Sequence, residues 1–278
     1  MRKNLLGLDH AVLRVANLDG AAEAFVAMGF KLSSRGRHTL GTENRCVMFG
    51  FDYLELLWVP PGVEAPFYAG TSGAEGMTAL AFKSDDVAGL HQVWTKDGLD
   101  PADWVEFSRA VEVGQDRTQD ARFRAVALPA SRTPGGRAFA VEHLTPELVW
   151  RPGSSRHPNQ VTGINKIVVA AEDPAAVALA WARIVDVPRH PVPGGIAVNT
   201  GAAPIVVLTP AALARQLPGV ELPALDRGPA FGAIYLSCGD LKIAASLLQA
   251  HGLQPIALAD GSLGISADRA RGVALVLK

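Results

Sequence analysis

The sequence contains little cysteine and no long hydrophobic run. Its two cysteines, Cys46 and Cys238, lie far apart within expected strands and form no CxxC pair, which argues against a disulfide framework and against a thiolate zinc site. The longest apolar runs, such as residues 205–208, have the length of a strand and cannot cross a bilayer. These features predict a soluble protein from a reducing compartment, and we expect a cytoplasmic location.

Neither sign of charge dominates, because 26 basic residues stand against 27 acidic ones. A balanced chain does not attract phosphate backbones or anionic membranes, so we expect neither nucleic acid nor membrane as a partner. The N-terminus reaches Asp9 and His10 before an apolar segment develops, which argues against a signal peptide. The absence of a GxSxG elbow and of a Walker-type loop gives no support to a serine hydrolase or a nucleotide hydrolase.

The composition and length predict a globular chain of two domains. Hydrophobic residues make up 49% of the sequence and charged residues 19%, which is typical of a chain with a large core. A length of 278 residues suggests two domains at roughly 150 residues each. The polar, proline-containing stretch that begins at residue 151 is typical of a connector. We therefore expect domains over 1–150 and 163–278, joined by a linker over 151–162.

The order of one strand, one helix and three strands repeats along the chain. In the first copy a strand over 7–15 leads into a helix that Asp19 can cap and Gly29 ends, and three strands follow before residue 60. The order returns three times, at intervals of about 70 to 90 residues. The four helices are expected to start at Asn17, Asp86, Asp173 and Asp240. The pattern predicts an α+β chain of four βαβββ modules, the alternative being four unrelated strand–helix units.

Two residues of the first module stand out on otherwise apolar strand faces. Strand alternation puts His10 on a face with Leu8 and Val12, and Glu55 on a face with Leu57. A buried carboxylate needs a partner, for which a metal, an arginine or water at an open sheet face are the alternatives. His10 is correspondingly either a ligand or an ordinary hydrogen-bonded core residue.

The second module offers fewer candidates. Glu142 and His143 are adjacent on its last strand, so alternation lets at most one of them reach the same cavity. By analogy with the late position of Glu55 in its module, we expect Glu142 to do so. The first strand of this module has Ala79 where His10 would fall.

A basic cluster surrounds the turn after the first helix. Arg35, Arg37 and Arg45 lie there with His38, and Thr42 and Asn44 add short polar groups. Arginine forks bind carboxylates and phosphates, which favours an anionic substrate. The alternative is a solvated basic edge that discourages strand pairing. His38 is a second candidate histidine, either as a substitute ligand or as a proton carrier.

These motifs resemble the vicinal oxygen chelate superfamily, and within it the glyoxalase-like domain proteins. The resemblance is carried by Leu8-Asp9-His10-Ala11-Val12, Asn17-Leu18, Gly29-Phe30, Gly36-Arg37-His38, Gly41-Thr42-Glu43-Asn44, Tyr53-Leu54-Glu55-Leu56-Leu57, residues 142–150 and His157-Pro158-Asn159. It implies that two βαβββ modules pair into a cupped half-barrel around a divalent metal, so that four modules form two half-barrel domains. By the same resemblance the metal ligands are His10, Glu55 and Glu142, and the fourth position, Ala79, has none.

The resemblance implies an enzyme of the lyase, isomerase or dioxygenase type that acts on a small oxygenated substrate in the N-terminal cup, with an anionic substrate allowed by the arginines. One imidazole and two carboxylates suit Mn, Fe, Zn or Mg. The expected catalytic groups are Glu55 and His38, and the expected substrate-binding residues are Arg37, His38, Thr42, Asn44, Tyr53 and Trp58. The alternative is a metal-free protein that binds a small molecule in the same cup.

The C-terminal half is expected to serve as scaffold, lid or dimer surface. Its strands over 205–208 and 273–277 contain no ionisable residue. Open half-barrels leave sheet edges to be covered, so we expect a homodimer.

Overall fold

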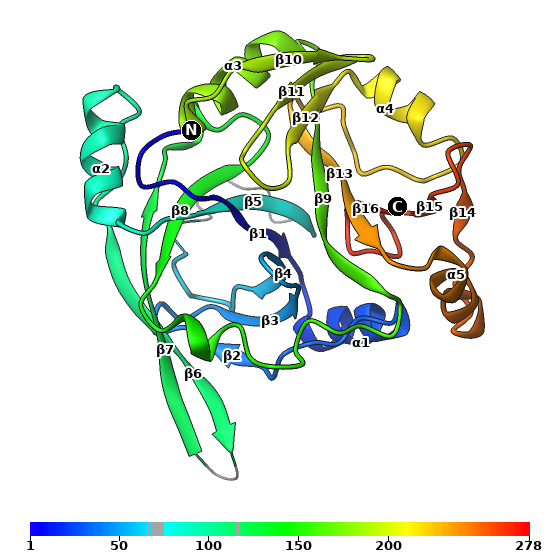
Figure 1. The fold of residues 1–278 in the computed structure, drawn as a ribbon, viewed down its shortest axis with the longest axis horizontal. Coiled ribbons are helices and arrows are strands. Elements are labelled where there is room, and N and C mark those ends of the chain that lie inside the picture. The colour runs from blue at the N-terminus through cyan, green and yellow to red at the C-terminus, as the bar shows by residue number, and fades with distance from the viewer. Residues whose placement is uncertain (66, 68–74, 115–116) are drawn as a thin grey trace.

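The strands of the protein form two eight-stranded sheets in a computed structural model that describes residues 1–65, 67, 75–114 and 117–278 (Figure 1). The first sheet consists of β1 (Gly7–Arg14), β2 (Gly36–Arg37), β3 (Glu43–Met48), β4 (Tyr53–Trp58), β5 (Gly76–Lys83), β6 (Val105–Gly114), β7 (Arg117–Ala127) and β8 (Arg137–His143). Their spatial order is β2-β3-β4-β1-β5-β8-β7-β6. Within each module the first strand pairs in parallel with the last, and the two modules join through the antiparallel pair of β1 and β5.

The second sheet repeats this arrangement. It consists of β9 (Val161–Ala170), β10 (Arg189–Val192), β11 (Gly195–Val198), β12 (Ile205–Leu208), β13 (Ala230–Cys238), β14 (Ile256–Ala257), β15 (Leu263–Ile265) and β16 (Ala274–Leu277). Its order, β10-β11-β12-β9-β13-β16-β15-β14, is that of the first sheet module by module. The prediction of an α+β fold with four βαβββ modules paired into two half-barrels is confirmed.

Each module carries one helix that starts at a capping side chain. The helices are α1 (Leu18–Ala27), α2 (Val87–Lys96), α3 (Pro174–Val185) and α5 (Leu241–Ala250). Asp86, Asp173 and Asp240 accept hydrogen bonds from the first free backbone N–H groups of their helices, as expected. In α1 the cap is Asn17 and not Asp19, because the Asn17 side chain accepts from the backbone N–H of Asp19 and of the next residue.

One hydrophobic core runs through both halves and includes the buried faces of these helices. Phe25 of α1, Trp94 of α2, Trp181 of α3 and Leu248 of α5 are fully buried in it. The indole N–H of Trp94 donates to the carbonyl of Ile184, which ties the helix of the second module to that of the third. The convex sides of both sheets are therefore covered, and each sheet presents its other face as a concave surface.

The stretch expected to be a linker packs against the first module. The imidazole of His157 accepts a hydrogen bond from Lys31 N at 3.0 Å and donates to the carbonyl of Met48 at 2.9 Å. Asn159 donates to the carbonyl of Met28, and β9 starts two residues later. The division into domains over 1–150 and 163–278 stays a prediction. Among the described residues, no helix combines the length and the apolar character that crossing a membrane requires.

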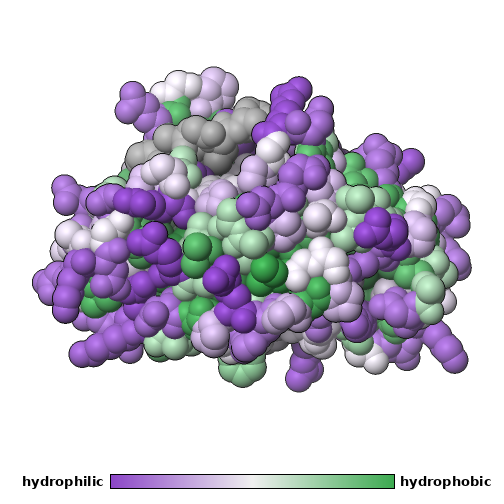
Figure 2. Space-filling view, turned by 90° about the horizontal axis from the view of Figure 1, so that it is seen from above, coloured by the Kyte–Doolittle hydropathy of each residue, from purple (hydrophilic) through white to green (hydrophobic). Residues whose placement is uncertain are grey.

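The concave face of the second sheet is filled by apolar side chains. Helix α4 (Pro210–Gln216) inserts Leu213 into it, and Leu217 follows. These pack against Val168 of β9 and Val276 of β16. The open, polar concave face is that of the first sheet, where the candidate site lies. On the outer face seen in Figure 2, hydrophobic side chains lie in small groups between hydrophilic ones.

Candidate functional site

A β-bulge in β1 brings the side chains of the consecutive residues Asp9 and His10 together. The pairing with β5 shifts between Leu8 and His10, so that Asp9 and His10 together oppose Ala81. Such a bulge re-aims side chains that strict alternation would separate. The carboxylate of Asp9 lies 2.7 Å from Nδ1 of His10. Strict alternation would put Asp9 and His10 on opposite faces, so the bulge is what allows their side chains to meet.

His10 lies between two carboxylates. Its Nε2 is 3.5 Å from Oε2 of Glu55, and Tyr53 stacks on the ring with the centroids 4.3 Å apart. Burial alone would lower the pKa of His10, but the hydrogen bonds with Asp9 and Glu55 outweigh it and raise the pKa to about 9. Burial would likewise raise the pKa of Glu55, yet His10 lowers it to about 2. At neutral pH the pair is an imidazolium and a carboxylate.

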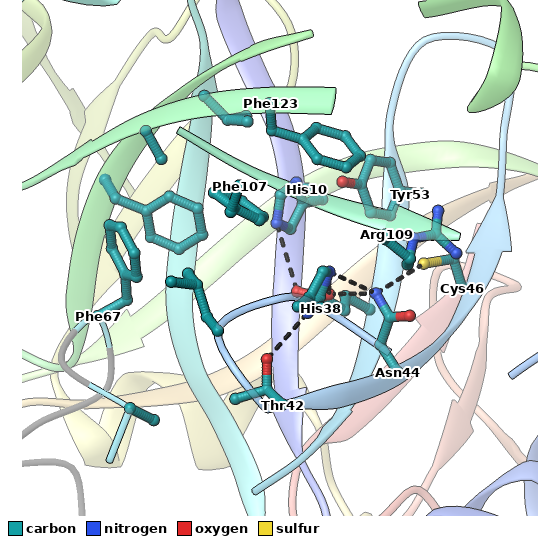
Figure 3. A pocket seen from close by; sticks show the side chains of 16 residues that line it. His10, His38, Thr42, Asn44, Cys46, Tyr53, Phe67, Phe107, Arg109 and Phe123 are labelled. Atoms are coloured by element: carbon teal, nitrogen blue, oxygen red, sulfur yellow. Dashed lines mark hydrogen bonds and ion pairs between the residues drawn. The ribbon is translucent and has the colours of Figure 1, made fainter. Parts of the chain in front are cut away.

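His38 belongs to the same cluster but is neutral. Its Nδ1 lies 2.9 Å from the hydroxyl of Thr42, and its Nε2 is 3.4 Å from the amide nitrogen of Asn44 (Figure 3). Asn44 also donates to Oε1 of Glu55 at 2.6 Å. Burial lowers the pKa of His38 to about 4. The structure thus brings His10, His38, Thr42, Asn44, Tyr53 and Glu55 to one cavity, which we call the cup cavity.

Arg109 is a further charged residue of the cup cavity, and the sequence interpretation missed it. It lies on β6 and is 7% exposed. Within the described part of the chain its Nε has no hydrogen-bond partner. The close approach of Gly36 makes room for it, because a Cβ on that residue would lie 2.3 Å from Cδ of Arg109. The sequence does carry a signal for Arg109, because alternation puts this basic residue on the same strand face as Phe107.

Aromatic rings from the second module, together with Phe67 from the segment before it, line the rest of the cup cavity. Phe107 and Phe123 stack with centroids 5.2 Å apart, and Phe67 packs against Phe139 at 5.6 Å. The cup cavity therefore combines the charged groups of the first module and Arg109 of β6 with a wall of aromatic rings (Figure 3).

Three of the expected site residues do not line the cup cavity. Glu142 faces α2, where its carboxylate accepts from the backbone N–H of Val87 at 3.1 Å. The expectation for Glu142 is wrong because alternation turns its neighbour His143 to the concave side, where Nε2 is 3.1 Å from Asp9. Trp58 packs against the core on the helix side of the sheet.

The basic cluster at the turn is largely structural. Arg37 is exposed and pairs with the buried carboxylate of Glu43. Arg35 donates to the same carboxylate at 2.6 Å. These pairs place Arg37 at the surface and outside the lining of the cup cavity, contrary to its expected substrate-binding role.

The pairing registers identify the residues at the four positions implied for metal ligands. His10 and Ala79 each lie seven residues before the cap of their helix, so they are equivalent. Glu55 pairs with the residue two positions after His10, and Phe139 pairs with the residue two positions after Ala79. Phe139 is therefore the equivalent of Glu55. At these four positions the first module has His10 and Glu55, which can bind a metal. The second module has Ala79 and Phe139, which cannot.

The residues present do not fit a divalent metal. Among the described residues no group of three His, Cys, Asp or Glu side chains is arranged to hold one. Of the residues that the structure does not describe, 66, 68–74 and 115 are of none of these types, and 116 is an aspartate. Each ring nitrogen of His10 faces a carboxylate, and a metal would have to displace the proton that these carboxylates favour. The expected ligand set of His10, Glu55 and Glu142 is not assembled.

Comparisons with known proteins bear on the fold and the family. The model of a family described as glyoxalase-like domain matches residues 8–185, which bears out the resemblance to glyoxalase-like proteins of the vicinal oxygen chelate superfamily. The curated proteins contain no match to this sequence.

Solved structures share the fold at low sequence identity. A crystal structure of a hypothetical protein from Staphylococcus aureus is similar over 98% of both chains, with a TM-score of 0.69 and 12% identity. A fusion of a xylose isomerase-like TIM barrel with 4-hydroxyphenylpyruvate dioxygenase is similar over 100% of this chain and 49% of its own, with a TM-score of 0.59 and 12% identity. A triple mutant of 4-hydroxymandelate synthase from Streptomyces coelicolor is similar over 98% and 92%, with a TM-score of 0.57 and 13% identity.

Proposed function

Because the chain belongs to the glyoxalase-like domain family, we propose that its first half-barrel binds a small organic anion in the cup cavity without a metal ion. This is the metal-free alternative to the metalloenzyme of lyase, isomerase or dioxygenase type. The observation that carries the proposal is the buried guanidinium of Arg109.

A comparison with another buried arginine supports a ligand for Arg109. Arg2 is 8% exposed, and its guanidinium donates to Asp97 and to the backbone carbonyls of Arg183 and Ile184. Arg109 is as buried and has no comparable set of acceptors in the described part of the chain. A buried cation without a counter-ion costs several kcal/mol. A carboxylate or phosphate group in the cup cavity would remove this cost through a charge-assisted hydrogen bond.

The aromatic wall restricts the body of the ligand. Phe107, Phe123 and Phe139 offer apolar ring surface beside the charged groups. Apolar area that these rings remove from water contributes about 25 cal/mol per Å² to binding. The chemistry of the cup cavity therefore suits a small carboxylate with a planar, apolar body.

The titratable groups of the cup cavity favour binding over proton transfer. General acid–base catalysis is most efficient when the pKa of the group lies near the working pH. The pKa of His10 is about 9, that of His38 about 4 and that of Glu55 about 2. Glu55 and His38 are thus weak bases at neutral pH, which supports a binding role for them more than the catalytic role expected from the sequence.

The experiment compares acids with their uncharged amides. Sodium benzoate and sodium phenylacetate are titrated into the protein by calorimetry, with benzamide and phenylacetamide as the uncharged probes. We expect the acids to bind and the amides to bind at least about tenfold more weakly. Arg109→Gln should abolish this preference, whereas the control Arg37→Gln, at the exposed surface, should keep it.

Two results would contradict the proposal. One is an unchanged affinity of the folded Arg109→Gln variant for the acids. The other is binding that disappears after treatment with EDTA and returns with Mn(II) or Zn(II). A homodimer and a cytoplasmic location remain part of the proposal, and size-exclusion chromatography with light scattering tests the dimer.

A further inference from the structure

A second cavity lies where the two half-barrels meet. It is lined by the start of β5, the loop before β8 and the loop before β13, and its residues include Thr78, Gly136, Arg137 and Arg227. A parallel bridge between residues 135 and 230 joins the two halves beside it. We call it the Arg137 cleft. It shares no residue with the lining of the cup cavity.

Arg137 is a buried cation whose charge the described residues do not balance. It is 9% exposed, and its Nε donates to the backbone carbonyl of Phe67 at 3.3 Å. None of the ion pairs among the described residues includes it, in contrast to Arg2, which pairs with Asp97. Residues 66 and 68–74, which flank Phe67 in the sequence and which the structure does not describe, contain no Asp or Glu. Burial lowers the pKa of Arg137, with no carboxylate to oppose it.

A polar side chain in the same cleft has no hydrogen-bond partner among the described residues. The hydroxyl of Thr78 is buried and makes no hydrogen bond within the described part of the chain. A buried hydroxyl without a partner costs about 1 to 3 kcal/mol. Native proteins seldom leave such groups unsatisfied, and this hydroxyl lies in the same cleft as a guanidinium that has no counter-ion among the described residues.

We propose that the Arg137 cleft binds a small oxyanion, a phosphate or carboxylate group, through the guanidinium of Arg137 and the hydroxyl of Thr78. A guanidinium offers parallel N–H donors that match two oxygens of such a group. The exposed Arg227 at the cleft adds a second positive charge.

The acidic residue of the cleft is engaged elsewhere. The carboxylate of Glu75 accepts a hydrogen bond from the backbone N–H of Ala16 at 2.9 Å, and its other oxygen lies 3.8 Å from Arg271. Glu75 therefore neutralises Arg271 and leaves Arg137 without a counter-ion. The proposal stands on the Arg137 cleft alone and does not depend on the ligand of the cup cavity.

The test follows backbone amides by NMR while sodium phosphate or, in a separate arm, sodium acetate is added at constant ionic strength. We expect saturable shifts at Thr78, Gly135 and Gly136 with at least one anion, and the two arms distinguish a phosphate site from a carboxylate site. Arg137→Gln should weaken binding about tenfold or more, because the charged donor is lost. The control Arg37→Gln should leave the affinity unchanged.

Thr78→Val provides a second variant that keeps the shape of the side chain. It removes a buried hydroxyl without a partner, so without anion its melting temperature should be equal to or above that of the wild type. Its affinity for the anion should fall a few-fold. Absence of saturable shifts with both anions, shifts confined to the cup cavity, or unchanged affinity in both folded variants would overturn the proposal.

Discussion

Asp9 and His10 are consecutive in the chain, yet their side chains face each other, with Oδ2 of Asp9 2.7 Å from Nδ1 of His10. The bulge in β1 makes this possible. Glu55 lies at the other ring nitrogen, so His10 is held as a cation at the base of the cup cavity. A histidine that binds a metal offers one ring nitrogen to the metal, whereas both ring nitrogens of His10 face carboxylates.

Replacing Asp9 should release the imidazole. In Asp9→Asn we expect the pKa of His10 to fall from about 9 by at least one unit, which corresponds to about 1.4 kcal/mol. Histidine resonances followed by NMR against pH measure this shift. The control Asp85→Asn, at an exposed position, should leave the titration unchanged. A His10 titration that is the same in Asp9→Asn and in the wild type would contradict the assignment.

The same pair predicts how stability depends on pH. The pKa of His10 is raised on folding, so its stabilising contribution is complete below its unfolded pKa of about 6.5 and is lost as the pH rises towards 9. The free energy of unfolding of the wild type should therefore fall between pH 7 and 9. Asp9→Asn should show a smaller fall, and urea titrations at both pH values compare the two.

The substitution Gly36→Ala tests whether the position of Arg109 matters for binding, and it changes no charge. A Cβ at Gly36 would lie 2.3 Å from Cδ of Arg109 and 2.6 Å from Oδ1 of Asn44, whereas one at Gly50 would meet nothing within 4 Å. Gly36→Ala should displace the guanidinium and weaken benzoate binding about tenfold, the effect of losing one charge-assisted hydrogen bond. Gly50→Ala, the matched control, should bind as the wild type does. Equal affinities of both variants would show that Arg109 does not hold the ligand.

The modular fold was predictable because its signals are local. The helix after the first strand of each module begins at an Asn or Asp cap, and the strands between helices are marked by glycine and apolar alternation. His10 and Glu55 were predictable for the same reason, since a charged residue on an apolar strand face is visible in the sequence.

The remaining features depend on pairing between distant strands. The bulge at Asp9 exists through the register of β1 with β5, and no pattern within β1 shows it. Glu142 was chosen by counting along the module, but the pairing of β5 with β8 makes Phe139 the equivalent of Glu55. The first sheet curls so that β6 meets the first module, where the backbone of Arg109 forms an isolated antiparallel β-bridge with that of His38. This contact depends on the curvature of the whole sheet.

Restoring the two missing ligand types should create a metal site. We expect the wild type to bind less than about a tenth of an equivalent of Mn(II) or Zn(II), because a protonated His10 is no ligand. In Ala79→His with Phe139→Glu, four ligands of the right types converge, and affinity for Zn(II) should rise with pH as His10 loses its proton. Elemental analysis and calorimetry measure both. Stoichiometric binding by the wild type would show that the present residues do hold a metal.

Asp52 links the two halves through a buried acceptor. Its carboxylate lies 3.1 Å from the backbone nitrogen of Ile164 in β9, and burial raises its pKa to about 6. The folded state therefore keeps a proton that the unfolded chain releases near pH 4, so stability falls as the pH rises from 4 to 6. Above pH 6 the buried charge costs up to about 3 kcal/mol, from a shift of about two pKa units.

Asp52→Asn separates the charge from the hydrogen bond, because the amide oxygen still accepts from Ile164. At pH 8 the variant should be more stable than the wild type by up to about 3 kcal/mol, and at pH 4 the two should be similar, since Asp52 is then neutral. Urea titrations at the two pH values measure this, with Asp85→Asn as the exposed control. Equal destabilisation of the variant at both pH values would contradict this prediction. It would mean that the amide does not replace the carboxylate as the acceptor for Ile164. The contact between the halves would then depend on the geometry of Asp52 and not on its charge.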